Sequence, residues 1–359
     1  MATAMGKRLS GKTVLITGAS SGIGKSTALE FARTSPSSLK LILTARRIDS
    51  LKALAAEITK EVGEGVQVLP VQLDVSKPDQ VRGFVQGLPE EYRHIDVLVN
   101  NAGMVQGIDK VGDIKENDVD AMMATNVTGL INMTQTVLQI MKKRDKGDII
   151  NIGSIAGREG YPGGAIYCAT KAAVRIFTEA MRKELIATRI RVIEIDPGQV
   201  ETEFSVVRFY GDKSKADAVY KGVTPLTPED IAETIVFAAG RPENVIIADV
   251  LVFPNHQVSR LSPRSVVKVV TDCVRRRPPQ SCTDESSCSY ADSNCLLGCC
   301  NCHAQEASRT GFEDVDRPTI FIIAPYGCHI AISSTLKDPA AACRWSSSPR
   351  DRCVHWLPH

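Results

Sequence analysis

A tyrosine and a lysine stand four residues apart in the segment GGAIYCATKAAVRIF, with a cysteine between them. Residues at this spacing lie one helical turn apart, so the phenol of Tyr167 and the ammonium of Lys171 would share a helix face. The pair is compatible with a catalytic acid beside its activator, with a cysteine nucleophile, or with an ordinary helix surface. A catalytic thiol needs a base and an electropositive niche. Because Lys171 alone offers little of either, we expect Cys168 to be a small buried or helix-flank residue.

The elements that would position this pair alternate between strands and helices from Thr13 to about Phe253. Apolar runs such as TVLIT, LKLILTA and IDVLVN alternate with amphipathic segments such as IDSLKALAAEITKEV. Strands that are apolar throughout and alternate with helices indicate a parallel sheet covered on both faces. We therefore predict an α/β fold: a doubly wound, Rossmann-type sheet of about seven parallel strands. The pattern further predicts a long helix around Asp118 to Lys143 and a helix from Pro228 that is capped by Thr227.

A glycine-rich turn, LITGASSGIGKS, joins the first predicted strand to the first helix. Its three glycines, Gly18, Gly22 and Gly24, suit a tight turn, a close approach of the backbone to phosphate, and close packing of helix on strand. The exposed amides and the positive dipole end of the helix favour a pyrophosphate. An ordinary strand-to-helix turn is the alternative. The position of the turn within a βαβ unit favours dinucleotide binding.

The end of the second strand indicates which dinucleotide binds. An NAD site usually places an acidic residue there to bind the ribose 2′-hydroxyl. This chain has TARR instead, and the guanidinium groups of Arg46 and Arg47 are suited to a 2′-phosphate. A solvated basic helix start is the alternative, and the nearby Asp49 argues for caution. We predict NADP as the cofactor.

Polar residues also follow the third and fourth strands. LDV, with Asp74 and Val75, ends the third strand, and NNAG, with Asn101, ends the fourth. Ligands of doubly wound sheets bind at the carboxyl ends of strands. Asp74 could accept from an adenine amino group and Asn101 could line the cofactor groove. Taken singly, however, each residue is more typical of a plain strand-end turn.

Six ordered motifs together resemble the short-chain dehydrogenase/reductase family: TGASSGIG, NNAG, ATNVTG, INIGSIAG, YCATK and DPGQVETEF. The resemblance covers roughly residues 10 to 257, which we predict as one NADP-binding domain, 1–257, holding both cofactor and substrate sites. It implies that Tyr167 is the general acid/base. The pKa of a free tyrosine is about 10, so a nearby ammonium, Lys171, is needed to favour the phenolate. Ser154 would donate to the substrate oxygen, and Asn126 would hold a water linked to Lys171, with helix packing as its alternative.

The resemblance also implies the cofactor contacts. Pro197 and Gly198 would shape the loop at the nicotinamide, and Val200 and Thr202 would contact its carboxamide. The full set of predicted cofactor-binding residues is Gly18, Ser20, Gly22, Ile23, Gly24, Arg46, Arg47, Asp74, Val75, Asn101, Tyr167, Lys171, Pro197, Gly198, Val200 and Thr202.

The segments after Thr202 resemble the branch of the family that acts on 3-hydroxy acids, with serine or L-allo-threonine as substrates. The branch implies oxidation of such hydroxyls, or reduction of carbonyl acids such as malonic semialdehyde. An anionic substrate needs a cation, and Arg208 and Arg158 are the candidates, although either is equally compatible with a solvent or subunit contact. A ketone or 3-ketoacyl reductase and a non-catalytic NADP sensor are the alternatives; the complete Asn, Ser, Tyr and Lys set argues against the sensor.

The overall charge and hydrophobicity of the chain exclude some classes of binding partner. Lys and Arg number 43 against 41 Asp and Glu, so no nucleic-acid-binding surface is indicated. The N-terminal segment has no apolar core of a signal peptide, and no segment offers the ~20 clean apolar residues of a membrane span. We expect a cytoplasmic enzyme without membrane or nucleic-acid partners. The family resemblance further implies a homotetramer or homodimer.

The C-terminal segment 258–359 differs in composition. Of 11 cysteines, only Cys168 precedes it. The segment has no sustained periodicity and is rich in Ser, Cys and Arg, so we expect a low-order, mostly disordered tail. Cys299, Cys302 and His303 match a haem-attachment pattern, but attachment would require export, and we expect no metal. Our hypothesis is that residues from about Val258 onward are translated intron or shifted-frame sequence.

Overall fold

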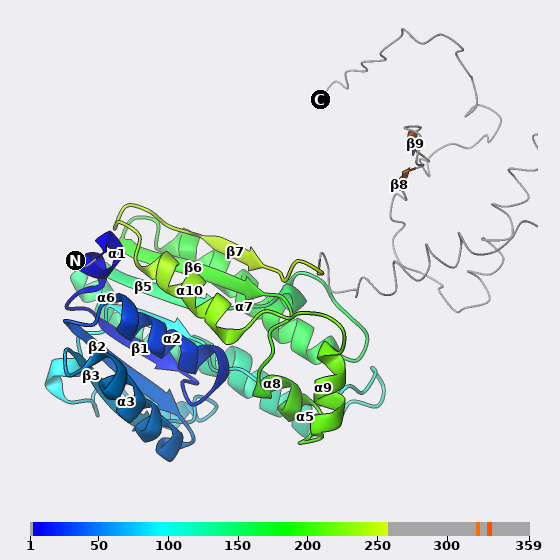
Figure 1. The fold of residues 1–359 in the computed structure, drawn as a ribbon, viewed down its shortest axis with the longest axis horizontal. Coiled ribbons are helices and arrows are strands. Elements are labelled where there is room, and N and C mark those ends of the chain that lie inside the picture. Colours follow the sequence, from blue (N-terminus) through cyan, green and yellow to red (C-terminus); the bar gives the residue numbers. More distant parts are fainter. Residues whose placement is uncertain (1–2, 258–320, 324–328, 332–359) are drawn as a thin grey trace, which may run out of the picture. The chain divides into compact units, whose positions relative to one another are not determined.

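The computed structural model describes residues 3–257, 321–323 and 329–331 (Figure 1). The first range forms a seven-stranded parallel sheet in the order β3-β2-β1-β4-β5-β6-β7, which confirms the predicted fold class. The order reverses between β1 and β4, and ligands of such sheets bind beyond the strand ends at that point. The strands are β1 (Thr13–Thr17), β2 (Leu39–Ala45), β3 (Val66–Gln72), β4 (Val97–Asn100), β5 (Lys146–Ile152), β6 (Arg189–Pro197) and β7 (Asp249–Val252).

Helices cover both faces of the sheet because successive strand residues point to opposite sides. On β1, Ile16 packs in a buried cluster with α2, α3 and α10, whereas the neighbouring Leu15 packs in a second cluster with α6 and α7. This double burial explains the continuous apolar strands. The helices named are α2 (Gly22–Thr34), α3 (Ile48–Val62), α10 (Pro228–Ala239), α6 (Leu130–Arg144) and α7 (Ala165–Glu184); the shorter α1 (Ala4–Leu9) and α4 (Pro78–Arg82) complete this set.

The predicted start of α10 is confirmed by a capping box. The backbone N–H of Thr227 donates to Oδ2 of Asp230 at 2.7 Å, and the backbone N–H of Asp230 donates to Oγ1 of Thr227 at 3.4 Å. Pro228 occupies the first helical position, where a missing N–H costs nothing. The cap and the proline together fix where the last helix of the domain begins.

The predicted long helix around Asp118 to Lys143 is interrupted. It consists of α5 (Glu116–Met123), a π-helical segment, η2 (Ala124–Gly129), and α6. Gly129 lies against the segment that follows β3, since a Cβ there would come within 2.8 Å of the Val75 carbonyl oxygen. π segments are often found at functional sites, and this one carries Asn126.

Two helices that the sequence pattern did not predict, α8 (Glu203–Arg208) and α9 (Lys213–Tyr220), follow β6. In Figure 1 they lie with α5 beyond the carboxyl ends of the strands. Both begin at a side-chain cap: Thr202 accepts from the Phe204 N–H, and Asp212 accepts from the Lys215 N–H. Short 3-10 turns, η1 (Glu90–Tyr92) and η3 (Ile155–Gly157), complete the domain.

Within the segment predicted as a low-order tail, β8 (Phe321–Ile323) and β9 (His329–Ala331) pair as antiparallel strands. They belong to a second unit of the chain. The predictions of disorder for 258–359, of its artefactual origin and of no metal at its Cys-X-X-Cys-His pattern otherwise concern residues outside those described.

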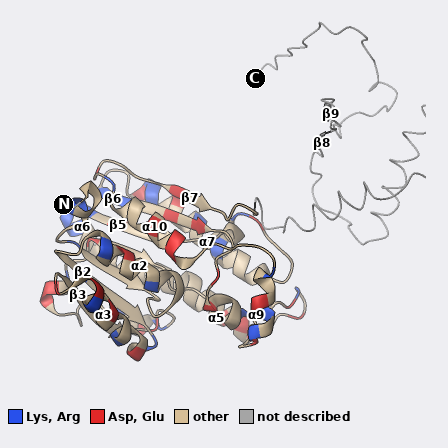
Figure 2. Ribbon diagram, viewed as in Figure 1, with Lys and Arg blue, Asp and Glu red and all other residues tan. Residues whose placement is uncertain are grey.

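Charges of both signs are interspersed over the helices, as on α3 and α9 in Figure 2. Within the described part of the chain, no helix is both long and apolar enough to cross a membrane. The same residues contain no group of three or more His, Cys, Asp or Glu side chains placed to hold a metal ion.

Candidate active site

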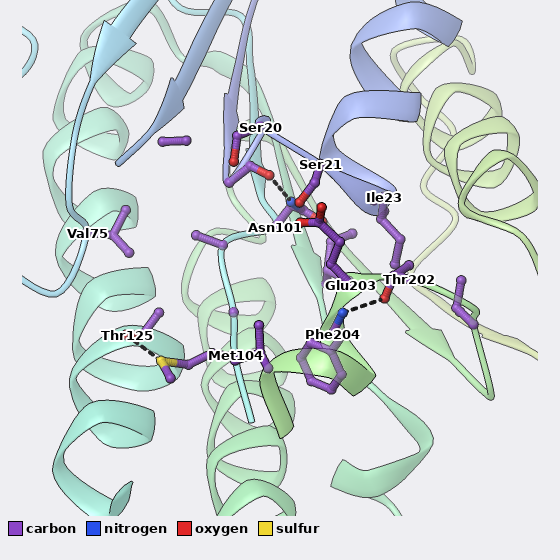
Figure 3. A pocket seen from close by; sticks show the side chains of 18 of the residues that line it. Ser20, Ser21, Ile23, Val75, Asn101, Met104, Thr125, Thr202, Glu203 and Phe204 are labelled. Atoms are coloured by element: carbon purple, nitrogen blue, oxygen red, sulfur yellow. Dashed lines mark hydrogen bonds between the residues drawn. The ribbon is translucent and has the colours of Figure 1, made fainter. Parts of the chain in front are cut away.

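A pocket of about 420 Å³ opens at the carboxyl ends of the strands (Figure 3). It is lined by fifteen of the sixteen predicted cofactor-binding residues, and by Ser154; Gly24, Asn126 and Arg208 are not in its lining. Residues that sequence reasoning placed at the ends of β1 through β6 therefore meet at one cavity. Its lining also includes Ser21, Met104, Thr125, Glu203, Phe204 and Val207, which were not predicted.

The glycine turn leaves no room for side chains. Gly18 has φ +67°, and a Cβ on it would come within 2.8 Å of the Ala102 Cα. A Cβ on Gly24 would lie 2.5 Å from Nδ2 of Asn101. Gly24 therefore packs behind the pocket wall, which is the helix–strand packing task expected of the third glycine.

Asn101 ties the end of β4 to this turn. Its side-chain Nδ2 donates to the carbonyl oxygens of Thr17 at 2.9 Å and of Gly18 at 3.2 Å, and its backbone N–H donates to Oγ1 of Thr17 at 3.0 Å. In Figure 3 the Asn101 side chain lies beside the turn that carries Ser20 and Ser21. Asn101 thus holds the turn in shape as well as lining the groove. Asp74 is likewise engaged locally, because its Oδ1 accepts from the Ser76 N–H at 3.0 Å.

The two arginines after β2 lie at one end of the pocket. Arg46 and Arg47 are both exposed, and one nitrogen of Arg47, Nη2, donates to Oγ of Ser20 at 3.2 Å and of Ser21 at 3.0 Å. The same nitrogen lies 3.1 Å from Oε2 of Glu203 on α8. Asp49, the reason for caution, is exposed in the first turn of α3 and is not part of the lining. This end of the pocket therefore carries two exposed guanidinium groups, one carboxylate and two hydroxyls.

Lys171 lies at the opposite, buried end. Its side chain is 6% exposed, and Nζ donates to the Ile152 carbonyl oxygen at 2.7 Å. Burial lowers the pKa of Lys171 to about 8, against the opposing effect of the carboxyl groups of Asp196 and Glu194. Nζ lies 6.0 Å from the ring centroid of Tyr167, on the preceding turn of α7. The two side chains thus share the helix face that their spacing predicted.

Tyr167 and Ser154 complete this end of the pocket. The Tyr167 ring meets the Phe204 ring edge-on, with 5.5 Å between centroids, so α8 packs directly on it. Ser154 follows β5 and begins η3, where its Oγ accepts from the Ala156 N–H at 3.1 Å. Cys168 is buried in an apolar cluster with Val105 and other residues, which agrees with the expectation of a small buried side chain.

Asn126 lies behind the pocket wall and bonds to protein groups. Its Oδ1 accepts from the Met104 N–H, and its Nδ2 donates to the Met104 carbonyl oxygen, each at 2.8 Å, and to Oγ1 of Thr170 at 3.1 Å. A Cβ on Gly103 would lie 3.5 Å from Oδ1 of Asn126 and 3.6 Å from Nζ of Lys171, so both side chains approach the same point. These bonds support the packing alternative for Asn126.

The two candidate substrate arginines differ in their contacts. Arg158 forms an ion pair with Asp196 at 2.7 Å and another with Asp249. Arg208 donates from Nη2 to the Gly163 carbonyl oxygen at 3.2 Å and lies 5.3 Å from the Tyr161 ring centroid. Its Nε is buried and has no hydrogen-bond partner among the described residues.

Sequence reasoning missed the contact between Arg47 and Glu203 because the two residues are 156 positions apart. The only available signal was the position of Glu203 directly after Thr202, which was predicted to contact the cofactor. Phe204, which follows, was missed for the same reason. A local sequence pattern does not indicate which side chains of the pocket the short helix α8 will contact.

A glycine-rich turn between the first strand and its helix, lining a cavity at the carboxyl ends of the strands, is typical of dinucleotide-binding sheets. A model of the short chain dehydrogenase family matches residues 12–210. The NADP-dependent 3-hydroxy acid dehydrogenase of Schizosaccharomyces pombe is 58% identical over 250 residues, which are 70% of this chain and 95% of that protein. The serine 3-dehydrogenase of Rhizobium radiobacter is 39% identical over 245 residues, 68% of this chain and 94% of that protein.

A solved structure of serine dehydrogenase in its closed form, complexed with NADP+, superimposes with a TM-score of 0.63 at 39% identity, and the match covers 68% of this chain and 96% of that one. The fold, the pocket and these similarities agree. This chain belongs to the short-chain dehydrogenase family and is an oxidoreductase.

Proposed function

We propose that the chain is an NADP-dependent dehydrogenase of small 3-hydroxy acids. Its substrates would be L-allo-threonine, serine and acids of the 3-hydroxypropionate or 3-hydroxyisobutyrate type, or in reverse the carbonyl acids such as malonic semialdehyde. The observation that carries the proposal is one pocket with Arg47 at one end and Ser154, Tyr167 and Lys171 at the other. The similarity to 3-hydroxy acid and serine dehydrogenases supports the substrate class.

The pocket residues fit NADP. Gly18 and Gly22 line the pocket with positive φ angles and no side chain, so a pyrophosphate can approach the backbone of the turn closely. Arg46 and Arg47 would hold the 2′-phosphate, because a guanidinium pairs well with phosphate oxygens. NADP, when bound, supplies the hydride acceptor of the reaction.

The protein's own groups would manage the proton at the substrate oxygen. In the oxidation direction, Tyr167 removes the hydroxyl proton, and in reduction it returns that proton to the carbonyl oxygen. The Lys171 ammonium stabilises the phenolate form of Tyr167, since an opposite charge favours the ionised state. Ser154 donates a hydrogen bond to the same substrate oxygen. Asn126 holds Met104 and Thr170 in place around this group.

Arg208 is the residue we propose for binding the substrate carboxylate. It ends α8, whose first turn carries Phe204 against Tyr167, and its Nε has no hydrogen-bond partner among the described residues. The contrasting contacts of Arg158, which already pairs with two carboxylates, make it the weaker candidate. In an Arg208→Met variant, the KM for L-allo-threonine should rise while the Kd for NADPH stays unchanged; an unchanged KM would remove Arg208 from the substrate site.

A substrate panel with the purified full chain tests the proposal. Turnover of L-allo-threonine and serine with NADP, and much slower turnover with NAD, is the expected result. A Tyr167→Phe variant should lose turnover and keep NADPH binding, whereas full activity of that variant would reject the mechanism. Faster reduction of larger apolar ketones or 3-ketoacyl compounds would favour the reductase alternative, and NADPH binding without turnover of any of these would favour a sensor.

The proposed cytoplasmic location and the homotetrameric or homodimeric assembly can be measured by cell fractionation and by light scattering. Leu251 on the edge strand β7 is 39% exposed and Phe237 on α10 is 46% exposed, so each side chain is available for contact with a second copy of the chain. We also propose that residues 1–257 form the enzyme domain and that residues 258–359 are a separate segment. Mass spectrometry of the expressed protein would show whether peptides from 258–359 exist.

A further inference from the structure

Two carboxyl side chains are buried on β6, directly beside the proposed catalytic lysine. Glu194 is 2% exposed and Asp196 is 1% exposed. They alternate along the strand, so both point to the same face of the sheet. That face is the one covered by α7, because Asn151, the register partner of Glu194 on β5, donates to Thr178 of α7 at 2.8 Å.

The two carboxyl groups are unequally paired. Asp196 accepts from Nε of Arg158 at 2.7 Å through Oδ2, and Arg158 also pairs with Asp249 on β7. Glu194 has no ion pair within the described residues. One oxygen of each group, Oε1 of Glu194 and Oδ1 of Asp196, is buried without a hydrogen-bond partner there.

The two unpartnered oxygens converge on Gly153. A Cβ at that glycine would lie 1.8 Å from Oδ1 of Asp196 and 2.9 Å from Oε1 of Glu194. A single proton held between these oxygens would satisfy both, because a protonated carboxyl group donates one hydrogen bond and its neighbour can accept it. Two adjacent buried carboxyl groups also resist ionising together.

The directions of the pKa shifts of the two carboxyl groups agree with this geometry. Burial, followed by the negative charges of Asp196 and Asp249, raises the pKa of Glu194 to about 8, and Arg158 opposes the shift. Burial also raises the pKa of Asp196, again against Arg158. Both shifts favour retention of one proton on the pair of carboxyl groups.

The two carboxyl groups and Lys171 contact adjacent residues at the end of β5. Lys171 donates to the Ile152 carbonyl oxygen, and the next residue is Gly153, on which both carboxyl groups converge. Several other charged groups face this region: Asp249 from β7, Arg158 after η3, and Arg175 and Arg182, which follow Lys171 at helical spacing on α7. Among the described residues, Arg158 is the one of these groups that forms an ion pair with either carboxyl group, and its partner is Asp196.

We propose that Glu194 and Asp196 share one proton and are positioning residues for Lys171, which keep it in its ammonium form as the pH rises. When the proton leaves, the pair gains a negative charge that holds the proton on Lys171. The catalytic part of this inference rests on the proposed function; the shared proton does not.

The first test is infrared absorption of the full chain, which distinguishes a protonated carboxyl group from a carboxylate without any substrate. A protonated carboxyl band should be present at neutral pH, disappear as the pH passes about 8, and be absent in Glu194→Gln. A spectrum without such a band at neutral pH would overturn the shared proton, even if the enzyme assignment were correct.

The second test is the pH profile of kcat/KM. Without the Glu194 charge, Lys171 loses its proton at lower pH, so the alkaline limb in Glu194→Gln should move down by about one pH unit. Glu184→Gln, at the exposed end of α7, is the matched control and should leave the profile in place. An alkaline limb that does not move, or moves up, would reject the positioning role, and a variant that fails to fold leaves the infrared titration of the native protein to decide.

Discussion

The two ends of the pocket hold their charges in opposite ways. At one end, Arg47 and Glu203 are 54% and 61% exposed in their side chains, and Arg47 is shared among several acceptors. At the other, Lys171 is 6% exposed and has one short bond to a main-chain oxygen. Water screens charges at the first end and is excluded at the second, so the same kind of substitution should have very different effects. An exposed charge can discriminate between two cofactors, whereas a buried charge can strongly stabilise the ionised form of a neighbouring catalytic group.

The largest effect is expected at the buried end. Lys171→Met should lower kcat/KM by about 10³-fold, or about 4 kcal/mol, because Tyr167 would lose the ammonium that stabilises its phenolate, and proton transfer by a positioned group such as Tyr167 contributes about 10²- to 10⁴-fold. Lys183→Met on the same helix, whose side chain is 74% exposed, is the matched control. Steady-state kinetics with NADP and L-allo-threonine measure both, and equal rates would place Lys171 outside the reaction.

Asn126→Ala should lower the free energy of unfolding by about 2–4 kcal/mol. It removes three hydrogen bonds from a side chain that is 1% exposed and leaves the Met104 backbone groups unpaired. Urea denaturation followed by circular dichroism measures the loss, with the exposed Asn117→Ala on α5 as the control. A loss below about 1 kcal/mol would mean that water replaces these bonds.

A smaller effect is expected at the exposed end. Arg47→Gln should weaken NADPH binding about 10-fold, or about 1.4 kcal/mol, and leave NADH binding unchanged, since only NADPH carries the 2′-phosphate. Lys52→Gln, an exposed residue of α3, is the control. Titration calorimetry with both cofactors measures the change; equal weakening for NADH would assign Arg47 to general pocket structure.

The smallest effect is expected for Glu203→Gln. Its carboxylate competes with the 2′-phosphate for Arg47, so its removal should tighten NADPH binding by about 2- to 3-fold, in line with the ~0.2–1 kcal/mol of exposed ion pairs. NADH binding should not change, and neither should NADPH binding in Glu201→Gln, two residues earlier. Weaker NADPH binding would instead mean that Glu203 holds Arg47 in its binding position.

The sequence could predict residues at both ends of the pocket, but for different reasons. The sheet, the glycine turn, Arg46 and Arg47 follow from local patterns, because strand alternation and turn chemistry are written in neighbouring residues. Ser154, Tyr167 and Lys171 were recognised through their order along the chain, and the structure brings them to one cavity. Their chemical roles remain proposals.

The remainder depends on contacts between distant segments. Arg158 was a candidate for substrate binding from sequence, yet its ion pairs with Asp196 and Asp249 arise from the packing of β5, β6 and β7. Likewise, nothing in RVIEIDPG indicates that its two acidic residues are buried, since an alternating apolar and acidic strand usually has a solvated face. The helices α8 and α9 are short and were missed because their hydrophobic pattern covers too few turns.

The π segment η2 has a consequence for how this helix tolerates length changes. A π turn accommodates one residue more than an α turn. A π turn and an α turn each complete about one rotation, so deleting a single residue between 124 and 129 would let α5 and α6 merge into one regular helix with their buried faces nearly in phase. The deletion would remove the widened turn itself, which carries Asn126 and places its amide against Met104 and Thr170. The extra residue thus serves the hydrogen bonds of Asn126 rather than the alignment of the two helices, and its loss should affect those bonds more than the packing of α5 and α6.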